Sequence, residues 1–434
     1  MKRQITSFLF LAALIAGCKD DGDVPAITSM TPAFGQSHIL ITIRGRNFPT
    51  DPSKVQVTFP NGKSAKVVSS APTKIELESP EGSKTGNVTV TVNSKSIDAG
   101  TFSFFTMYTY GFTRTPSVQK GIYWKDDNPV AIPNCYVISD MAVVGSDVYA
   151  IGIGATSEIP GSHFMCWKNG VPMAVEGSHP ASAYKGETNF TALAVSTTGK
   201  VYISGYEGVD VGLPKYWVDG KRIDLGENGL SIASDVVISG NDIYVAGGEG
   251  VSAGGAITMS AVYWKNGVKT TLNGIPGYCV ANAMAVSGPD VYAVGFERGS
   301  AGSNAVLWKN GAPTRLTQNN ISTSNVYDVA ASVVVSGNDV YVGGTNHVFH
   351  SGNTDPRVMV AWKNGVQMKL KQYNGPLEVL GISVIHDNLF ATVCVPLEVE
   401  SQYNLPSYLL QNTDVIIATE NDSKRIFGHR IVVY

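Results

Sequence analysis

Charged residues are scarce in this chain of 434 residues, where Asp, Glu, Lys and Arg together make up only 15%. The 35 acidic residues nearly balance the 32 basic ones, and no run of basic residues occurs. The composition therefore gives no electrostatic reason to expect a nucleic-acid partner. Coiled-coil heptads are absent too. Apolar residues reach 43% and glycines number 46, which is typical of a β-rich protein with many tight turns.

Long hydrophobic runs are also lacking. The apolar stretch from Ile5 to Ala16 follows two basic residues and is too short to span a bilayer comfortably as a helix. Such a pattern is typical of a targeting segment. The stretch ends in Leu-Ile-Ala-Gly-Cys18, which resembles the signal of bacterial lipoproteins. The resemblance implies that residues 1–17 are removed and that Cys18 is lipidated. The alternative is an ordinary signal peptide with a chance cysteine.

Residues 18–24 form an acidic tether after this segment. Their sequence after Cys18, Lys-Asp-Asp-Gly-Asp, resembles the export signals of surface lipoproteins in Bacteroidota. That resemblance implies a protein held in the outer membrane by its lipid anchor and exposed at the cell surface. A solvated linker has the same acidic composition, so this alternative stays open.

Cysteine is rare, with only five residues in the chain. An even number of remaining cysteines in an exported protein suggests disulfides. The four that remain beside Cys18 fall at unmatched positions of the repeats described below, and we predict that they are small buried thiols. They are Cys135, Cys166, Cys279 and Cys394.

Residues 25–106 are expected to form an antiparallel sandwich. Segments such as Ile39 to Ile43 and Val88 to Val92 alternate apolar and polar residues, and turns rich in Pro, Asn and Gly separate them. The segment resembles the IPT/TIG immunoglobulin-like domain, on Ile27, Pro32, Gly35, Ile41, Ile43, Gly45, Asn47, Phe48, Val55, Val57, Phe59, Pro80, Gly86, Val88, Val90, Val92 and Phe102. The resemblance implies a spacer or platform in a multidomain surface protein.

Residues 107–434 contain a repeat that is marked by every tryptophan of the chain. Each Trp lies in a short pattern such as Val-Tyr-Trp-Lys-Asn-Gly, and the copies recur roughly 43 to 54 residues apart. Asn-Gly between alternating segments is the strongest short hairpin signal. A full copy predicts four short antiparallel strands, which make one blade of a β-propeller. The tryptophans are Trp124, Trp167, Trp217, Trp264, Trp308 and Trp362.

The predicted second strand of the blade occurs seven times, from Tyr108 to Phe390. The repeats begin with a second strand at Met107 and finish with a first strand at His429–Tyr434, so the C-terminal strand can complete the first blade and remove an exposed edge. The predicted fold is therefore all-β: an immunoglobulin-like β-sandwich followed by a seven-bladed β-propeller closed by a C-terminal strand. Glycines after the second strand and Trp in the third resemble Kelch-type propellers.

Candidate ligand-binding residues lie where the predicted connections are long. Short turns are expected on one face of the ring and long variable loops on the other, which is where binding is usually built. Two carboxylates in one column of the first strand could hold a cation such as calcium or accept sugar hydroxyls, or they could simply cap turns or bind water. A His-x-x-His pair alone is weak evidence for zinc, so no metal site is predicted. The candidates are Asp140, Asp235 and Ser332 in first strands, and Tyr184, His347, His350, Tyr373 and Tyr403 in predicted loops.

Three functions remain open from the sequence. The first is a non-catalytic surface lipoprotein that binds a glycan or a protein through the long-loop face. The second is a polysaccharide lyase or glycosidase that uses the propeller pocket, although no nucleophile elbow, phosphate loop or HExxH motif occurs. The third is a purely structural or assembly role. No catalytic residue and no cofactor is assigned, and the membrane is expected to be a partner through the lipid anchor only.

Overall fold

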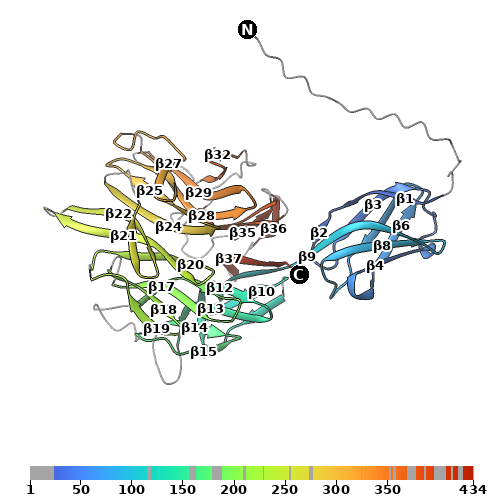
Figure 1. The fold of residues 1–434 in the computed structure, drawn as a ribbon, viewed down its shortest axis with the longest axis horizontal. Helices are drawn as coiled ribbons and strands as arrows, with labels where there is room; N and C mark the ends of the chain where they lie inside the picture. The colour runs from blue at the N-terminus through green and yellow to red at the C-terminus, as the bar shows by residue number, and fades with distance from the viewer. Residues whose placement is uncertain are drawn as a thin grey trace, which may run out of the picture. The chain divides into compact units, whose positions relative to one another are not determined.

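The structure is a computed structural model in which almost all of the regular structure is β-strand (Figure 1). It describes residues 24–114, 119–126, 128–155, 163–177, 188–208, 212–227, 229–253, 256–272, 277–323, 325–350, 353–354, 358–368, 378–385, 388–394, 407–411, 414–418 and 424–433. The chain separates into two compact parts, residues 1–106 with 433–434 and residues 107–432. Within the described residues, no helix is long and apolar enough to cross a membrane.

The first part is an Ig-like β-sandwich, as the alternating segments predict. One antiparallel sheet has the order β1-β3-β7-β6, and in the other β8 pairs with β4 and β9, while β2 runs parallel to β9. Ile41, Ile43 and Val90 are fully buried between the sheets because every second residue of their strands faces inward. The strands are β1 (Ala26–Thr31), β2 (Phe34–Gly35), β3 (Leu40–Arg46), β4 (Val55–Phe59), β5 (Lys63–Ser64), β6 (Lys66–Ala71), β7 (Lys74–Glu78), β8 (Gly86–Val92) and β9 (Lys95–Arg114), with short 3-10 turns at Pro52–Lys54 and Pro60–Gly62.

The second part consists of four-stranded antiparallel repeats. In the described residues, β12–β15, β16–β19 and β33–β36 are separate four-stranded sheets, while β20 to β32 form one sheet of 13 strands in which β22 pairs parallel with β24 and β26 with β28. β37 pairs with β9, next to β10 and β11. The strands are β10 (Gln119–Lys125), β11 (Asn128–Ala131); β12 (Cys135–Val144), β13 (Asp147–Gly154), β14 (His163–Lys168), β15 (Val171–Met173); β16 (Thr188–Val195), β17 (Val201–Gly208), β18 (Gly212–Val218), β19 (Lys221–Asp224); β20 (Ile232–Ser239), β21 (Asp242–Ala253), β22 (Ala256–Lys265), β23 (Val268–Thr271); β24 (Tyr278–Ser287), β25 (Asp290–Arg298), β26 (Ser303–Lys309), β27 (Ala312–Arg315); β28 (Val326–Ser336), β29 (Asp339–His350), β30 (Asn353–Thr354), β31 (Val358–Lys363), β32 (Val366–Gln367); β33 (Glu378–Ile385), β34 (Asn388–Cys394), β35 (Ser407–Gln411), β36 (Asp414–Ala418); and β37 (Lys424–Val433).

Two elements differ from the boundaries that the sequence suggests. β9 is one continuous strand of 20 residues, where two separate strands were expected at Thr101–Phe104 and Met107–Phe112. The segments expected as long loops at 247–259 and 345–357 are largely strand, because β21 pairs with β22 out to Ala253 and β29 extends to His350. Backbone pairing between neighbouring strands extends these hairpins, although their residues carry few strong β-formers.

A β-bulge recurs at the same place in the first strand of six repeats. In β20, for example, the register with β21 shifts between Ala233 and Asp235, which leaves Ser234 as the extra residue. The bulge brings the carbonyl of Ile232 so close to Gly247 that a Cβ there would collide with it. This close approach explains the glycine of the second strand. The bulged residues are Ser139, Thr191, Ser234, Asn282, Ala331 and Leu380.

The Asn-Gly turns have the backbone conformation that their sequence predicts. The side chains around each turn also form a set of polar contacts, which we call a clasp. Asn266 and Gly267 both have positive φ, at 51° and 81°, as a type I′ hairpin requires. The Asn266 side chain accepts from the N–H of Ile243 and donates to Asp242, both between 2.8 and 2.9 Å. Lys265 forms an ion pair with Asp242 at 2.7 Å and lies over the ring of Tyr244. Equivalent clasps form on Asp147, Asp290 and Asp339.

Acid should weaken these clasps. Hydrogen bonds from Lys and then from Asn lower the pKa of Asp147, Asp242, Asp290 and Asp339 below the ordinary 3.8. Since the folded-state pKa is depressed, the stabilisation is present above the ordinary pKa and is lost as the pH falls through the folded-state values. We expect the melting temperature to fall as the pH drops below the ordinary aspartate pKa, and to fall less when all four residues are replaced by Asn. Equal slopes for both proteins in a thermal melt series would contradict this.

Aromatic residues join each repeat to the next one. Trp264 packs in one core cluster with Tyr202 and Tyr216 of the preceding repeat, and Trp308 packs likewise with Tyr244. This agrees with the expectation that the Trp and Tyr columns are packing residues and not a sugar-stacking surface. Cys135, Cys166 and Cys279 form no disulfide and are buried in core clusters, and burial raises the pKa of each thiol to about 12. The prediction of buried thiols is confirmed for these three.

Candidate functional site

A cavity of about 750 Å³ lies where the first strands of the repeats converge. Its lining comes from β9, β12, β16, β20, β24, β28 and β33, with Tyr110 contributed by β9. Asp140, Asp235 and Ser332, the three first-strand residues singled out from the sequence, all line it. The residues that follow each bulge therefore meet in one cavity, although they are far apart along the chain.

The two carboxylates of the cavity hold the backbone together. Asp140 is 7% exposed and accepts hydrogen bonds from the Tyr110 hydroxyl at 2.9 Å and from the N–H of Leu193 at 2.8 Å. It also accepts from the N–H of Met141. Oδ1 takes two of these hydrogen bonds and Oδ2 takes one, so the protein engages both oxygens. The geometry is that of a structural clamp between neighbouring first strands.

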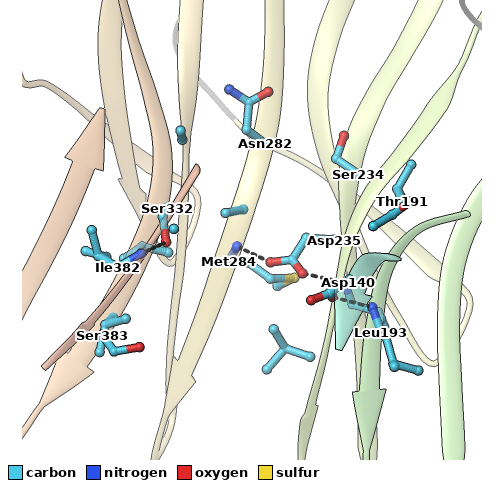
Figure 2. A pocket seen from close by; sticks show the side chains of 18 of the residues that line it. Asp140, Thr191, Leu193, Ser234, Asp235, Asn282, Met284, Ser332, Ile382 and Ser383 are labelled. Atoms are coloured by element: carbon cyan, nitrogen blue, oxygen red, sulfur yellow. Dashed lines mark hydrogen bonds between the residues drawn. The ribbon is translucent and has the colours of Figure 1, made fainter. Parts of the chain in front are cut away.

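Asp235 repeats this arrangement two repeats further along. Its Oδ1 accepts from the N–H of Val236 and its Oδ2 from the N–H of Met284, both at 2.8 Å (Figure 2). The Ser332 hydroxyl accepts from the N–H of Ile382 at 3.2 Å. Asp140, Asp235 and Ser332 each accept a hydrogen bond from a backbone N–H of the following repeat. At the position after the bulge, a side chain that accepts in this way alternates with Ala or Gly. The residues at this position are Asp140, Ala192, Asp235, Ala283, Ser332 and Gly381.

A second layer of polar side chains lines the cavity beside these acceptors, and the sequence analysis missed it. Thr191, Ser234 and Asn282 are the bulged residues of their strands, and Figure 2 shows them one level away from Asp235 and Asp140. Ser139 is the equivalent residue of β12, and Ser383 lies on β33. A small polar residue directly before the acceptor column was the signal in the sequence.

Some polar side chains of this cavity form hydrogen bonds within the protein, and others do not. Thr191 donates to the carbonyl of Ala233 at 2.8 Å, and Asn282 donates to that of Ala330 at 3.0 Å. Ser139, Ser234 and Ser383 are half-buried, and their hydroxyls have no hydrogen-bond partner among the described residues. These three side chains are therefore available to a ligand.

The remaining candidates are not brought to this cavity by the described structure. His347 and His350 lie in strand β29, opposite Tyr327 and Asn353, and not in a loop as expected. Cys18, Tyr184, Tyr373 and Tyr403 lie outside the described residues. Over the described part of the chain, no group of three His, Cys, Asp or Glu residues could hold a metal ion.

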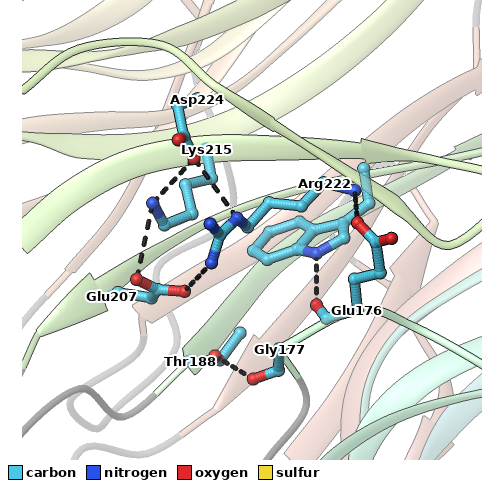
Figure 3. Close-up of polar contacts among 8 residues, drawn as sticks. Glu176, Gly177, Thr188, Glu207, Lys215, Arg222 and Asp224 are labelled. Atoms are coloured by element: carbon cyan, nitrogen blue, oxygen red, sulfur yellow. Dashed lines mark hydrogen bonds and ion pairs between the residues drawn. The ribbon is translucent and has the colours of Figure 1, made fainter.

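A charged cluster lies away from the cavity, at the end of β17. Lys215 is only 3% exposed and contacts Asp224 at 2.8 Å and Glu207 at 3.4 Å (Figure 3). Glu207 also pairs with Arg222 at 3.0 Å, and the hydrogen bond from Lys215 lowers the pKa of Asp224. Two cations face two anions, so this cluster is electrically balanced and its charges are mutually satisfied.

The chain has distant structural likenesses. An auxiliary nutrient binding protein from Bacteroides thetaiotaomicron VPI-5482 is 11% identical, with 94% of this chain and 97% of that chain covered and a TM-score of 0.32. One from Bacteroides ovatus ATCC 8483 is 15% identical, with 91% and 85% covered and a TM-score of 0.24. A polysaccharide lyase, an ulvan lyase, is 11% identical, with 65% and 83% covered and a TM-score of 0.42.

A comparison with curated proteins gives no match. A family model does match the first part of the chain, where it covers residues 25–108. That range coincides with the sandwich whose buried core alternates along β3, β4 and β8. Residues 25–108 are an IPT/TIG domain.

Proposed function

We propose that the chain is a non-catalytic binding protein that takes a neutral, hydroxyl-rich ligand, such as a glycan, into the cavity of a seven-bladed, Kelch-like β-propeller. Support for the ring comes from the three separate four-stranded sheets, from the antiparallel hairpins that repeat through β20–β32, and from the pairing of β37 with β9, which joins the C-terminal strand to the first repeat. Closure of this kind covers the edge that β9 would otherwise expose. In this proposal the cavity is the channel at the centre of the ring.

The observation that carries the proposal is the set of unpaired hydroxyls in the cavity. Ser139, Ser234 and Ser383 present donors and acceptors that the described protein does not use. A hydroxyl can both donate and accept, which suits the hydroxyls of a sugar. A cavity of about 750 Å³ is within the range of small-molecule sites.

The charged residues of the cavity lining limit the kinds of ligand that it can bind. The lining contains Asp140 and Asp235 and, among the described residues, no Lys, Arg or His. Two carboxylates disfavour an anionic ligand, such as a polyuronate, by like-charge repulsion. The same two groups accept hydrogen bonds from backbone N–H groups, so they are not arranged as the free acid and base of a glycosidase.

The proposal also assigns roles to the segments of the chain that precede the propeller. Lipidation at Cys18 would hold the protein in the outer membrane, residues 18–24 would act as a tether, and the IPT/TIG domain would act as a spacer. Two or more acyl chains on one residue give stable anchoring. The bulged residues precede the acceptor column in each first strand, so they lie nearer to the connection from the preceding repeat. The ligand would therefore approach from the face that carries these connections.

Replacing the three serines should weaken binding without harming the fold. A soluble protein that begins at Val24 would be screened on an array of neutral and acidic glycans, and the best neutral hit would be titrated by calorimetry. Each lost hydrogen bond costs about 0.5–1.5 kcal/mol, so Ser139→Ala with Ser234→Ala and Ser383→Ala should weaken binding at least about tenfold.

Val268→Thr provides the control, because Val268 is 70% exposed on β23 and lies away from the cavity. It should bind as the wild type does. Unchanged affinity in the folded triple variant, or a preference for acidic glycans, would overturn the proposed ligand site.

A further inference from the structure

A second pocket of about 700 Å³ lies at the outer side of the repeat β24–β27. Glu297 of β25, Asn304 of β26 and Arg315 of β27 line it, together with the connection that follows β27. The sequence predicts a long loop here, from Thr317 to Asp328, on the face that carries the variable connections. None of its lining residues belongs to the central cavity.

A buried polar network holds the walls of this pocket. Glu297 is 2% exposed, and its Oε2 accepts a hydrogen bond from Arg315 Nη2 at 3.0 Å while Oε1 accepts from Arg315 Nε. Glu297 Oε1 also accepts from Asn304 Nδ2 at 2.8 Å. Such a bidentate pair fixes the plane of the guanidinium, and the pairing with Glu297 raises the pKa of Arg315.

The connection is fixed by the same network. The Asn304 side chain, 3% exposed, accepts from the backbone N–H of Asn319 at 2.6 Å. The Asn319 amide donates in turn to Asp328 at 2.7 Å and to the carbonyl of Ser303 at 3.1 Å. Residues on either side of Asn319 are therefore held in place before any ligand arrives, which reduces the entropy cost of binding.

Equivalent positions in two other repeats give an internal comparison. Glu207 and Glu249 occupy the place of Glu297 in their second strands, where Glu207 is paired with Lys215 and Arg222 and Glu249 with Lys269. In the β16–β19 repeat the guanidinium of Arg222 also contacts Asp224 (Figure 3). Arg315 has Glu297 as its acidic partner, and its Nη1 makes no hydrogen bond in the described part of the chain.

The rim of the pocket carries further unused groups. The amide of Gln318 and the hydroxyl of Thr314 are exposed and have no partner among the described residues. The Asn320 side-chain Oδ1 accepts a hydrogen bond from the N–H of Ser322 at 3.3 Å, which leaves Nδ2 of the same amide as a donor. Pro313 and Ile321 supply apolar surface to the same lining.

We infer that this pocket, lined by Arg315, Gln318 and Asn320 over the buried Glu297–Asn304 pair, is a second binding site for a neutral saccharide. The charges of Glu297 and Arg315 cancel, so neither an anion nor a cation is favoured. Amide groups offer a donor and an acceptor side by side, which matches neighbouring sugar hydroxyls. Pro313 and Ile321 can contact the apolar face of a sugar ring. The inference does not depend on the central cavity, because the two linings share no residue.

The test uses the protein that begins at Val24 and carries the triple serine change, so that binding at the central cavity is weakened. Maltose, cellobiose and lactose are the neutral probes, with glucuronic acid and glucosamine as charged comparators, and binding is followed by saturation-transfer NMR titration. We expect measurable binding of at least one neutral disaccharide. Adding Gln318→Ala and Asn320→Ala should weaken that binding about tenfold or more, since two or more hydrogen bonds are lost.

Gln367→Ala is the matched control, because Gln367 is an exposed glutamine on the outer strand β32 of the neighbouring repeat. It should leave the titration unchanged. Absence of binding by every neutral probe in the triple serine background would overturn the inference, and so would residual binding that is insensitive to Gln318→Ala with Asn320→Ala. Either result leaves the proposed central site to its own test, which compares the wild type with the triple serine variant.

Discussion

Deleting Gly428 to Tyr434 is expected to destroy the cooperative unfolding of the repeat region. β37 pairs with β9, and the deletion removes most of the strand that completes this four-stranded group. The free edge of β9 would be left unpaired, and exposed edges template aggregation. A loss of several kcal/mol is a large share of the total stability of a folded domain. Thermal melts and size-exclusion chromatography of the protein that begins at Val24 would measure it.

Adding the deleted strand back as a peptide tests whether the loss of stability comes from the missing strand or from general damage to the fold. A synthetic peptide of residues 424–434 should restore part of the melting temperature, because an added strand can pair with an open sheet edge. A peptide with the same composition in scrambled order serves as the control. An unchanged melting temperature after the deletion would contradict closure by the C-terminal strand.

Trp264→Ala is expected to destabilise the protein by about 3–5 kcal/mol. The side chain is 1% exposed and packs between two repeats, against Ala233 of its own repeat and Tyr202 of the preceding one. Its removal leaves a cavity at an interface that the neighbouring strands cannot close without losing their register. Urea denaturation followed by circular dichroism would give the change in unfolding free energy.

Phenylalanine replacements test the physical reason for this effect. Trp264 Nε1 is buried without a hydrogen-bond partner in the described structure, so Trp264→Phe loses only packing. Trp217 Nε1 donates to the carbonyl of Glu176 at 2.8 Å, and Trp217→Phe would leave that carbonyl without this donor. We therefore expect Trp217→Phe to cost about 1 kcal/mol more than Trp264→Phe. The reverse order would refute this account of the tryptophan column.

Local signals in the sequence predicted much of the architecture. The Asn-Gly turns are set by residues that tolerate positive φ, and they form where they were expected, as at Asn310 and Gly311. The Trp and Tyr columns also pack between repeats as expected, because the same order of strands in each repeat puts the same face against its neighbour. The role of Lys309 in pairing with Asp290 was not foreseen, since it needs two strands to be brought side by side.

The candidate site also has features that the sequence predicts and features that only the folded structure reveals. That Asp140 and Asp235 share a column follows from aligning the repeats, but their hydrogen bonds to Leu193 and Met284 join different repeats, and only the folded structure reveals these partners. The outer pocket depends in the same way on Asn319, which reaches Asp328 of the following repeat.

The sequence by itself determined the β-rich class, the IPT/TIG segment, the hairpin turns and the repeat, because these depend on composition, local backbone preference and period. Tertiary structure decided which side chains share the cavity. In a regular strand Ser139 and Asp140 would point to opposite faces, as would Ser234 and Asp235. The bulge shifts the register by one residue, and both members of each pair line the same cavity. Strand alternation is a local rule, whereas a bulge arises from pairing with a neighbouring strand.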